Sequence, residues 1–152
     1  MIELFRKITN YITTPVAKDG MAEHFINTGN LHYNNKEYDL ALEQYTAAIR
    51  LNSNHFDAYL NRGCAYLMLG NKNSNALEDF NTAISINPKH FLAYYNRGLT
   101  YHRFEKIDAA LKDYDRTIEL NPNYSSAYIS RGLLKADFSE DYGAALKDYN
   151  HV

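Results

Sequence analysis

Four glycines recur along the chain at an almost constant interval. Gly29, Gly63, Gly98 and Gly132 lie 34, 35 and 34 residues apart. The last three each follow an arginine in the phrases Asn-Arg-Gly, Asn-Arg-Gly and Ser-Arg-Gly, and the first closes a looser copy, Asn-Thr-Gly. A fixed period of this length is typical of solenoids, in which one unit is copied end to end and buries its apolar face only against its neighbours. The period therefore indicates the fold class before any local propensity is considered.

The register of these glycines divides the chain into five parts. An N-terminal segment at 1–21 precedes four units at 22–55, 56–90, 91–124 and 125–152, the last of them shortened. Within each unit, two apolar runs at helical spacing flank a polar turn. Asn87-Pro88 and Asn121-Pro122 end the second and third units, because proline has no N–H to continue a helix and disfavours helical backbone before it. The sequence therefore predicts an all-α chain of helix pairs.

These units resemble the tetratricopeptide repeat family over 22–152. Besides the glycine at the eighth position, each unit has an aromatic at its fourth position: Phe25, Tyr59, Tyr94 and Tyr128. The second helix of each unit has an alanine near its start: Ala41, Ala76, Ala110 and Ala145. An aromatic follows each alanine four residues later: Tyr45, Phe80, Tyr114 and Tyr149. Small residues let paired helices approach closely, and the aromatics fill the space between pairs. The resemblance implies a right-handed α-solenoid of antiparallel helix pairs, about four repeats long, whose first helices line a concave face.

The seventh position departs from the family, where leucine is usual. It holds Thr28 in the first unit and arginine, Arg62, Arg97 and Arg131, in the others. Two interpretations are open. The arginines either form ion pairs with carboxylates on the second helix of a neighbouring repeat, such as Asp79 or Asp113, or present a cationic edge to a partner. The structural interpretation is favoured.

A polar row and an apolar stripe are expected on the concave face. Asn27, Asn61 and Asn96 share one position, with Ser130 next, and an amide can both donate to and accept from a peptide backbone. Beside them runs an apolar stripe: Ile26, Leu60, Tyr95, Ile129, flanked by Leu67, Leu99 and Leu133. Such a stripe marks a partner site if it is exposed, and belongs to the packing between helices if it is not. The candidate groove residues are Asn27, Asn30, Tyr33, Leu60, Asn61, Leu92, Tyr95, Asn96, Leu99, Arg103 and Ser130.

One specialised branch of the family binds acidic chaperone tails through a clamp of two asparagines and three cations. The resemblance places Asn30 and Asn61 at the asparagine positions, but Ile26, Leu92 and Asn96 stand where the cations belong. Because charge-assisted hydrogen bonds give such a clamp its strength, chaperone-tail binding is not expected. The groove should prefer apolar or uncharged protein or peptide segments.

The composition argues against several other kinds of function. The formal charge is -2, with 16 basic and 18 acidic residues, so nucleic acid is not an expected partner. No run approaches the roughly 18 apolar residues of a membrane span, and no secretory signal precedes the repeats. Cys64 is the single cysteine and has no catalytic histidine near it in sequence, and the six histidines do not form a metal-ligand pattern. We therefore expect a cytoplasmic protein without enzymatic activity, cofactor or metal.

Both ends invite more than one interpretation. Leu4, Phe5, Ile8, Tyr11 and Ile12 predict an amphipathic helix, ended by Thr13-Thr14-Pro15 and followed by a flexible link at Lys18-Asp19-Gly20. This helix could cap the first repeat, dock into a groove of its own or a neighbouring copy, or lie on a membrane surface. The fourth unit stops in mid-pattern at Val152, which favours a fragment of a longer protein over an edge covered by another chain.

The sequence thus predicts an adaptor that holds an extended or helical segment of another protein. Two alternatives stay open: an accessory repeat domain of a larger enzyme or signalling protein, and a module that self-assembles through its N-terminal helix or its uncapped last repeat.

Overall fold

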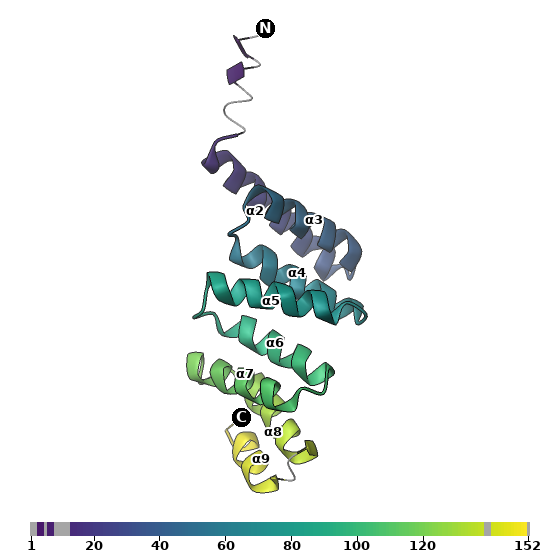
Figure 1. Cartoon of the computed structure of the whole chain (residues 1–152), viewed down its shortest axis with the longest axis vertical. Helices are drawn as coiled ribbons and strands as arrows, with labels where there is room; N and C mark the ends of the chain where they lie inside the picture. The colour runs from purple at the N-terminus through teal and green to yellow at the C-terminus, as the bar shows by residue number, and fades with distance from the viewer. Residues whose placement is uncertain (1–2, 5, 8–12, 139–140, 152) are drawn as a thin grey trace. The chain divides into compact units, whose positions relative to one another are not determined.

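The computed structural model describes residues 3–4, 6–7, 13–138 and 141–151, and these contain eight helices of eight or more residues and no strand (Figure 1). The chain divides into two compact units, residues 1–71 and 72–152. Unit 1 contains α2 (Pro15–Asn34), α3 (Tyr38–Leu51) and α4 (Phe56–Leu69). Unit 2 contains α5 (Asn73–Ile86), α6 (Phe91–Arg103), α7 (Ile107–Leu120), α8 (Ser125–Phe138) and α9 (Tyr142–Tyr149). The all-α repeat fold predicted from the glycine period is confirmed.

The start of α2 corrects one expectation. Lys18-Asp19-Gly20 was expected to be a flexible link, but these residues lie inside α2. Thr14 caps this helix, since its hydroxyl accepts a hydrogen bond from the Ala17 N–H at 3.2 Å, and Pro15 takes the first helical position. Proline is favoured at that position because the backbone N–H that it lacks would have no partner in the first turn, so Thr-Pro begins a helix here rather than ending one. The amphipathic helix expected before it falls mostly outside the described residues.

The recurring glycines bring the two helices of a pair together. A Cβ atom at Gly98 would lie 2.8 Å from the Tyr114 ring, and one at Gly132 would lie 2.8 Å from the Tyr149 ring. Both distances are too short for real atoms, so any larger residue would separate α6 from α7 or α8 from α9. At Gly29, Gly98 and Gly132 the sequence period therefore coincides with this glycine–aromatic contact.

Small and aromatic side chains also join successive pairs inside each unit. In unit 1, one buried cluster combines Ala41, Leu42 and Tyr45 of α3 with Ala65 of α4. In unit 2, Ala110 and Tyr114 of α7 pack with Leu134 of α8. Each second helix thus contacts the first helix that follows it, which is how a repeat buries an apolar face that it cannot cover alone.

Two of the position-seven arginines, Arg97 and Arg131, form ion pairs, as the favoured interpretation held, but the main partner of each lies in its own repeat and not in a neighbouring one. Arg97 binds Asp113 through two hydrogen bonds of 2.8 and 2.7 Å, and Asp113 lies on the second helix of the same repeat. Arg131 likewise binds Asp148 of α9, and it also contacts Asp115 of α7. Pairing within the repeat arises because positions seven of one helix and about 23 of the next face each other in an antiparallel pair.

Candidate functional site

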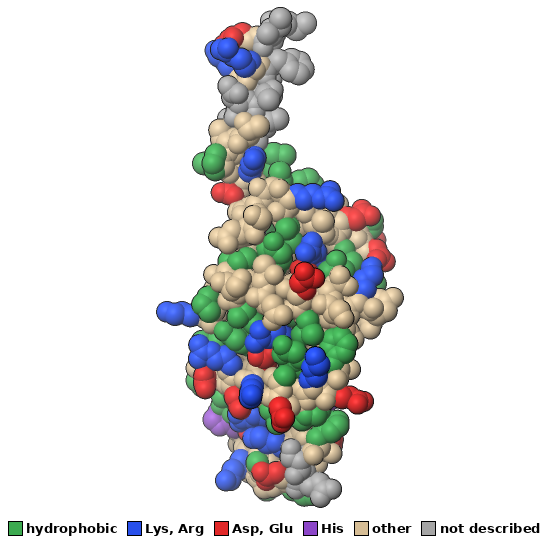
Figure 2. All heavy atoms as spheres, in the orientation of Figure 1, with side chains coloured by type: hydrophobic (Ala, Val, Ile, Leu, Met, Phe, Trp, Pro, Cys, Tyr) green, Lys and Arg blue, Asp and Glu red, His purple; other side chains and the backbone are tan. Residues whose placement is uncertain are grey.

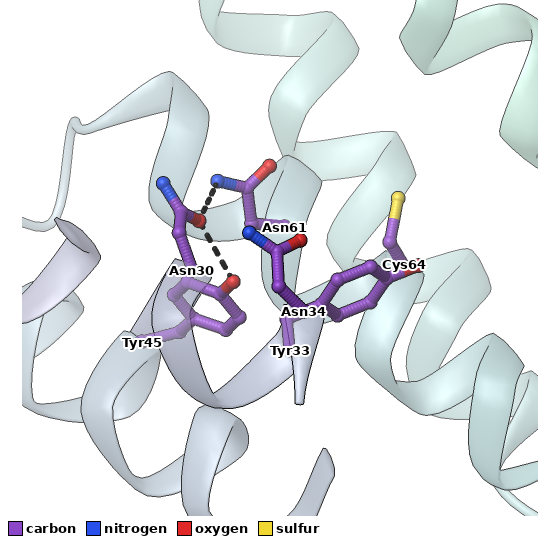
Figure 3. Close-up of a pocket in the computed structure, with 6 residues that line it drawn as sticks. All are labelled: Asn30, Tyr33, Asn34, Tyr45, Asn61 and Cys64. Atoms are coloured by element: carbon purple, nitrogen blue, oxygen red, sulfur yellow. Dashed lines mark hydrogen bonds between the residues drawn. The ribbon is translucent and has the colours of Figure 1, made fainter. Parts of the chain in front are cut away.

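A pocket of about 290 Å³ opens in unit 1 between α2 and α4, above a tyrosine of α3 (Figure 3). Asn30, Tyr33 and Asn34 come from α2, Tyr45 from α3, and Asn61 and Cys64 from α4. Three of these six, Asn30, Tyr33 and Asn61, are sequence-predicted groove residues that the fold brings together.

Asn30 is the centre of a small hydrogen-bond network in this pocket. Its Oδ1 accepts one bond from the Tyr45 hydroxyl at 2.8 Å and another from Asn61 Nδ2 at 3.0 Å. These bonds fix the orientation of both amides. In the described part of the chain, Asn30 Nδ2 and Asn61 Oδ1 make no hydrogen bond, and Figure 3 shows both atoms turned away from Tyr45. The pair therefore leaves one amide nitrogen as a donor and one carbonyl oxygen as an acceptor.

The pocket mixes polar and apolar lining groups and carries no charge at neutral pH. Burial raises the pKa of the Cys64 thiol to about 12. Burial is also the largest cause that raises the pKa of Tyr33 and of Tyr45, with the nearby thiol adding to it. All three groups therefore stay protonated, and no cation lines the pocket. Such a site complements an uncharged amide better than a carboxylate.

In unit 2, the first helices present apolar side chains in place of amides. The residues at positions five and nine of α6 and α8 form what we call the apolar strip: Tyr95, Leu99, Ile129 and Leu133. Tyr95 and Leu99 are half-buried, whereas Ile129 and Leu133 are 41% and 47% exposed. The Tyr95 hydroxyl lies 3.3 Å from Ser130 Oγ, which connects α6 to α8 and holds the Tyr95 ring in place.

The remaining predicted groove and stripe residues differ in how exposed they are. Leu60 is only 6% exposed and Ile26 only 4%, so in unit 1 the expected stripe belongs to the packing between helices, the interpretation that the sequence left open. Asn27 is exposed but does not line the pocket. Leu92 and Asn96 are half-buried on α6, and Arg103 is exposed at its end.

Sequence reasoning treated Tyr45 as a space-filling aromatic and missed its hydroxyl. A signal was present: the corresponding residue of the second repeat is Phe80, and a buried tyrosine usually needs a hydrogen-bond partner that phenylalanine does not. The ninth position, Asn30, supplies that partner in the first repeat alone, because Cys64, Leu99 and Leu133 occupy it in the others.

Charges on the surface are mixed. On the face shown in Figure 2, basic and acidic side chains alternate over unit 2 without forming a region of one sign. Among the residues that the structure describes, no three His, Cys, Asp or Glu side chains gather in a way that could hold a metal ion. Within the same residues, no helix is both long and apolar enough to cross a membrane.

Helix pairs held by glycine–aromatic contacts define an α-helical repeat protein. The family models agree: one described as tetratricopeptide repeat matches residues 91–124, and one described as TPR repeat matches 29–70 and 70–103. The chain belongs to the tetratricopeptide repeat family.

Solved structures similar to this chain are repeat domains of the same kind. A crystal structure of MamA has a TM-score of 0.80 at 25% identity, covering 86% of this chain and 75% of that one. The first TPR of Spaghetti (RPAP3), bound to the HSP90 peptide SRMEEVD, has a TM-score of 0.77 at 28% identity, covering 80% and 95%. The Arabidopsis OM64 TPR domain has a TM-score of 0.76 at 28% identity, covering 78% and 98%. A search of curated protein sequences found no match.

Proposed function

We propose that this chain is a non-enzymatic interaction module that binds a segment of a partner protein along its first helices. The observation that carries the proposal is the Asn30–Asn61 pair, which is oriented by internal hydrogen bonds and leaves one donor and one acceptor open. A peptide backbone offers one acceptor and one donor per residue, so it can satisfy both. The Spaghetti domain, which was solved with a peptide, supports this use of the fold.

Each unit favours its own kind of partner segment, uncharged for unit 1 and apolar for unit 2. The neutral pocket favours amides, and the exposed Ile129 and Leu133 favour aliphatic or aromatic side chains. An acidic tail like the one in the Spaghetti complex is not the proposed ligand. Ile26 and Leu92, which take the place of two clamp cations, offer it no charge-assisted bond.

The proposal takes the sequence-defined units 22–55, 56–90, 91–124 and 125–152 as its repeats. Support comes from α4, α6 and α8, which begin at Phe56, Phe91 and Ser125. We also propose a cytoplasmic location, which the presence of a single cysteine supports, since it allows no disulfide within the chain.

The unit 1 surface is tested with a peptide array probed by the full chain. We expect binding to apolar, uncharged peptides over acidic ones of equal length, and Asn61→Ala to weaken it about tenfold, the equivalent of one well-made hydrogen bond. Asn54→Ala is the matched control, since this exposed asparagine uses only its backbone N–H, bonded to Asn52. Equal binding by both variants, or a preference for acidic tails, would contradict the proposal.

The unit 2 surface needs its own pair of variants. Leu133→Asp places a charge in the apolar strip, whereas Leu40→Asp places one on α3 at a similar exposure, 43% against 47%. Isothermal titration with a peptide selected on the array should show a loss of at least about tenfold for Leu133→Asp and no change for Leu40→Asp. An unchanged affinity of the Leu133 variant would remove unit 2 from the binding surface. Titration of the Asn96→Ala variant, on α6, with the same peptide tests whether the polar row also contributes to the affinity.

A further inference from the structure

The residue at the tenth position is fully buried in the second, third and fourth repeats but exposed in the first. Ala65, Thr100 and Leu134 occupy it in the second, third and fourth repeats, and each is 0% exposed. Leu31 occupies it in the first repeat and is 66% exposed. A side chain that the fold normally buries between two repeats is therefore open on α2.

The opposite surface is open on α9. Tyr142, Leu146 and Tyr149 are 68%, 59% and 38% exposed. The residues at the same positions of the first repeat are Tyr38, Leu42 and Tyr45; Leu42 and Tyr45 are 8% and 1% exposed. The α9 face thus has the same three residue types as the α3 face but is exposed in the described chain.

The interior of the chain shows what covers such a face. In unit 1, Leu42 and Tyr45 pack with Ala65, the tenth-position residue of the next repeat. In unit 2, Tyr114 packs with Leu134, the tenth-position leucine of the next repeat, while Leu111 lies against the same cluster. Because Leu31 has the same position and residue type as Leu134, the α2 face matches the kind of surface that the α9 face requires.

We propose that α2 of a second copy packs against α9, so that Leu31 of one molecule meets Leu146 and Tyr149 of the next. The junction repeats the contact that joins α7 to α8 inside the chain. It is heterologous, since the two faces differ, and it extends head to tail unless one face is blocked.

The test is the molar mass in solution of the full chain and two variants, measured by light scattering and sedimentation over a range of concentrations. The wild type should exceed its monomer mass of 17.5 kDa increasingly as concentration rises. Leu31→Glu and Leu146→Glu should each remain monomeric, because each blocks one face. An equimolar mixture of the two should form a dimer that grows no further, since one intact α2 face and one intact α9 face remain.

The mixture distinguishes this junction from other modes of assembly. A symmetric contact between two α9 faces predicts that Leu31→Glu still associates like the wild type, and that outcome overturns the proposal. A wild type that stays monomeric at every concentration, or a mixture that stays monomeric, also overturns it and leaves these faces to another protein. Leu40→Glu, an exposed leucine outside both faces, should associate as the wild type does. Circular dichroism of each variant is the folding control. If helicity and melting temperature are unchanged, a loss of association is due to the blocked face and not to unfolding.

Discussion

Tyr45 and Tyr114 occupy the same position in two repeats, yet their hydroxyl groups have different surroundings. The Tyr45 hydroxyl donates to Asn30, whereas the Tyr114 hydroxyl is buried and has no hydrogen-bond partner of good geometry in the described chain. Leu99 stands where Asn30 does in the first repeat. A single change at the ninth position therefore decides whether a buried phenol is paired.

Replacing each tyrosine by phenylalanine should separate the two cases. Tyr45→Phe removes a made hydrogen bond and leaves Asn30 with one donor fewer, so the free energy of unfolding should fall by about 1 kcal/mol. Tyr114→Phe removes a buried hydroxyl whose interaction with Ser130 falls short of good hydrogen-bond geometry, and it should leave stability unchanged or raise it by up to about 1 kcal/mol. Urea unfolding measures both. Equal losses would show that the Tyr114 hydroxyl forms a stabilising hydrogen bond, with Ser130 as the candidate partner.

The thiol of Cys64 gives a second residue-scale prediction. Because burial raises its pKa from 9.0 to about 12, its alkylation at pH 8 should be about 100-fold slower or more in the folded protein than in urea. The folded rate should continue to rise with pH above 9, where the unfolded rate levels off. Timed iodoacetamide labelling followed by mass spectrometry checks this, and equal rates in both states would show an accessible thiol of ordinary pKa.

At the scale of helices, one carboxylate ties α8 to α9. Asp148 accepts bonds from Arg131 and Lys135, and its side chain is 5% exposed. Burial by itself would raise the pKa of Asp148, but the hydrogen bonds and charges of these two cations together lower it by more than burial raises it. The pKa of Asp148 therefore lies below 3.8. The folded state thus binds this proton less readily than the unfolded chain does.

The sign of this shift sets the pH range in which the contact stabilises the fold. The contribution is fully present above about pH 3.8 and is lost as the pH falls below that value through the folded pKa. Asp148→Asn should therefore cost about 3 kcal/mol at pH 6, because it leaves Arg131 and Lys135 without their shared carboxylate. The difference between wild type and variant should narrow below pH 3.8. Urea midpoints at several pH values measure it, and a constant difference down to pH 2.5 would contradict the assignment.

The helices of unit 2 should also differ in how readily they open. The α7 helix contacts both α6 and α8, whereas the contacts of α9 with the described helices are mainly those with α8. In a repeat protein, stability is a sum over neighbouring contacts, so a helix with one neighbour opens first. Hydrogen exchange at low protein concentration should therefore show faster exchange in α9 than in α7. Equal protection there would mean that α9 is covered.

At the scale of the whole molecule, fold class could be predicted in full and the site only in part. The glycine period, the alternation of apolar runs and the aromatic positions predict helix pairs because close approach at Gly98 or Gly132 is a local steric requirement. The same local reasoning was wrong at Lys18-Asp19-Gly20, where it took Thr-Pro as a helix end. The fold shows that Thr14 caps a helix that runs through this segment.

The sequence by itself determined the repeat, its helices and the residue types on the first helices, since these depend on spacing along one chain. Only the tertiary structure decided which of those side chains are exposed to a partner. Ile26 and Leu60 share the expected face with Tyr95 and Ile129, but neighbouring helices cover the first two and leave Ile129 open. It also decided that Asn30, Tyr45 and Asn61 meet in one network. Burial and hydrogen bonding between helices depend on which residues face each other in space, and periodicity along the chain does not specify that.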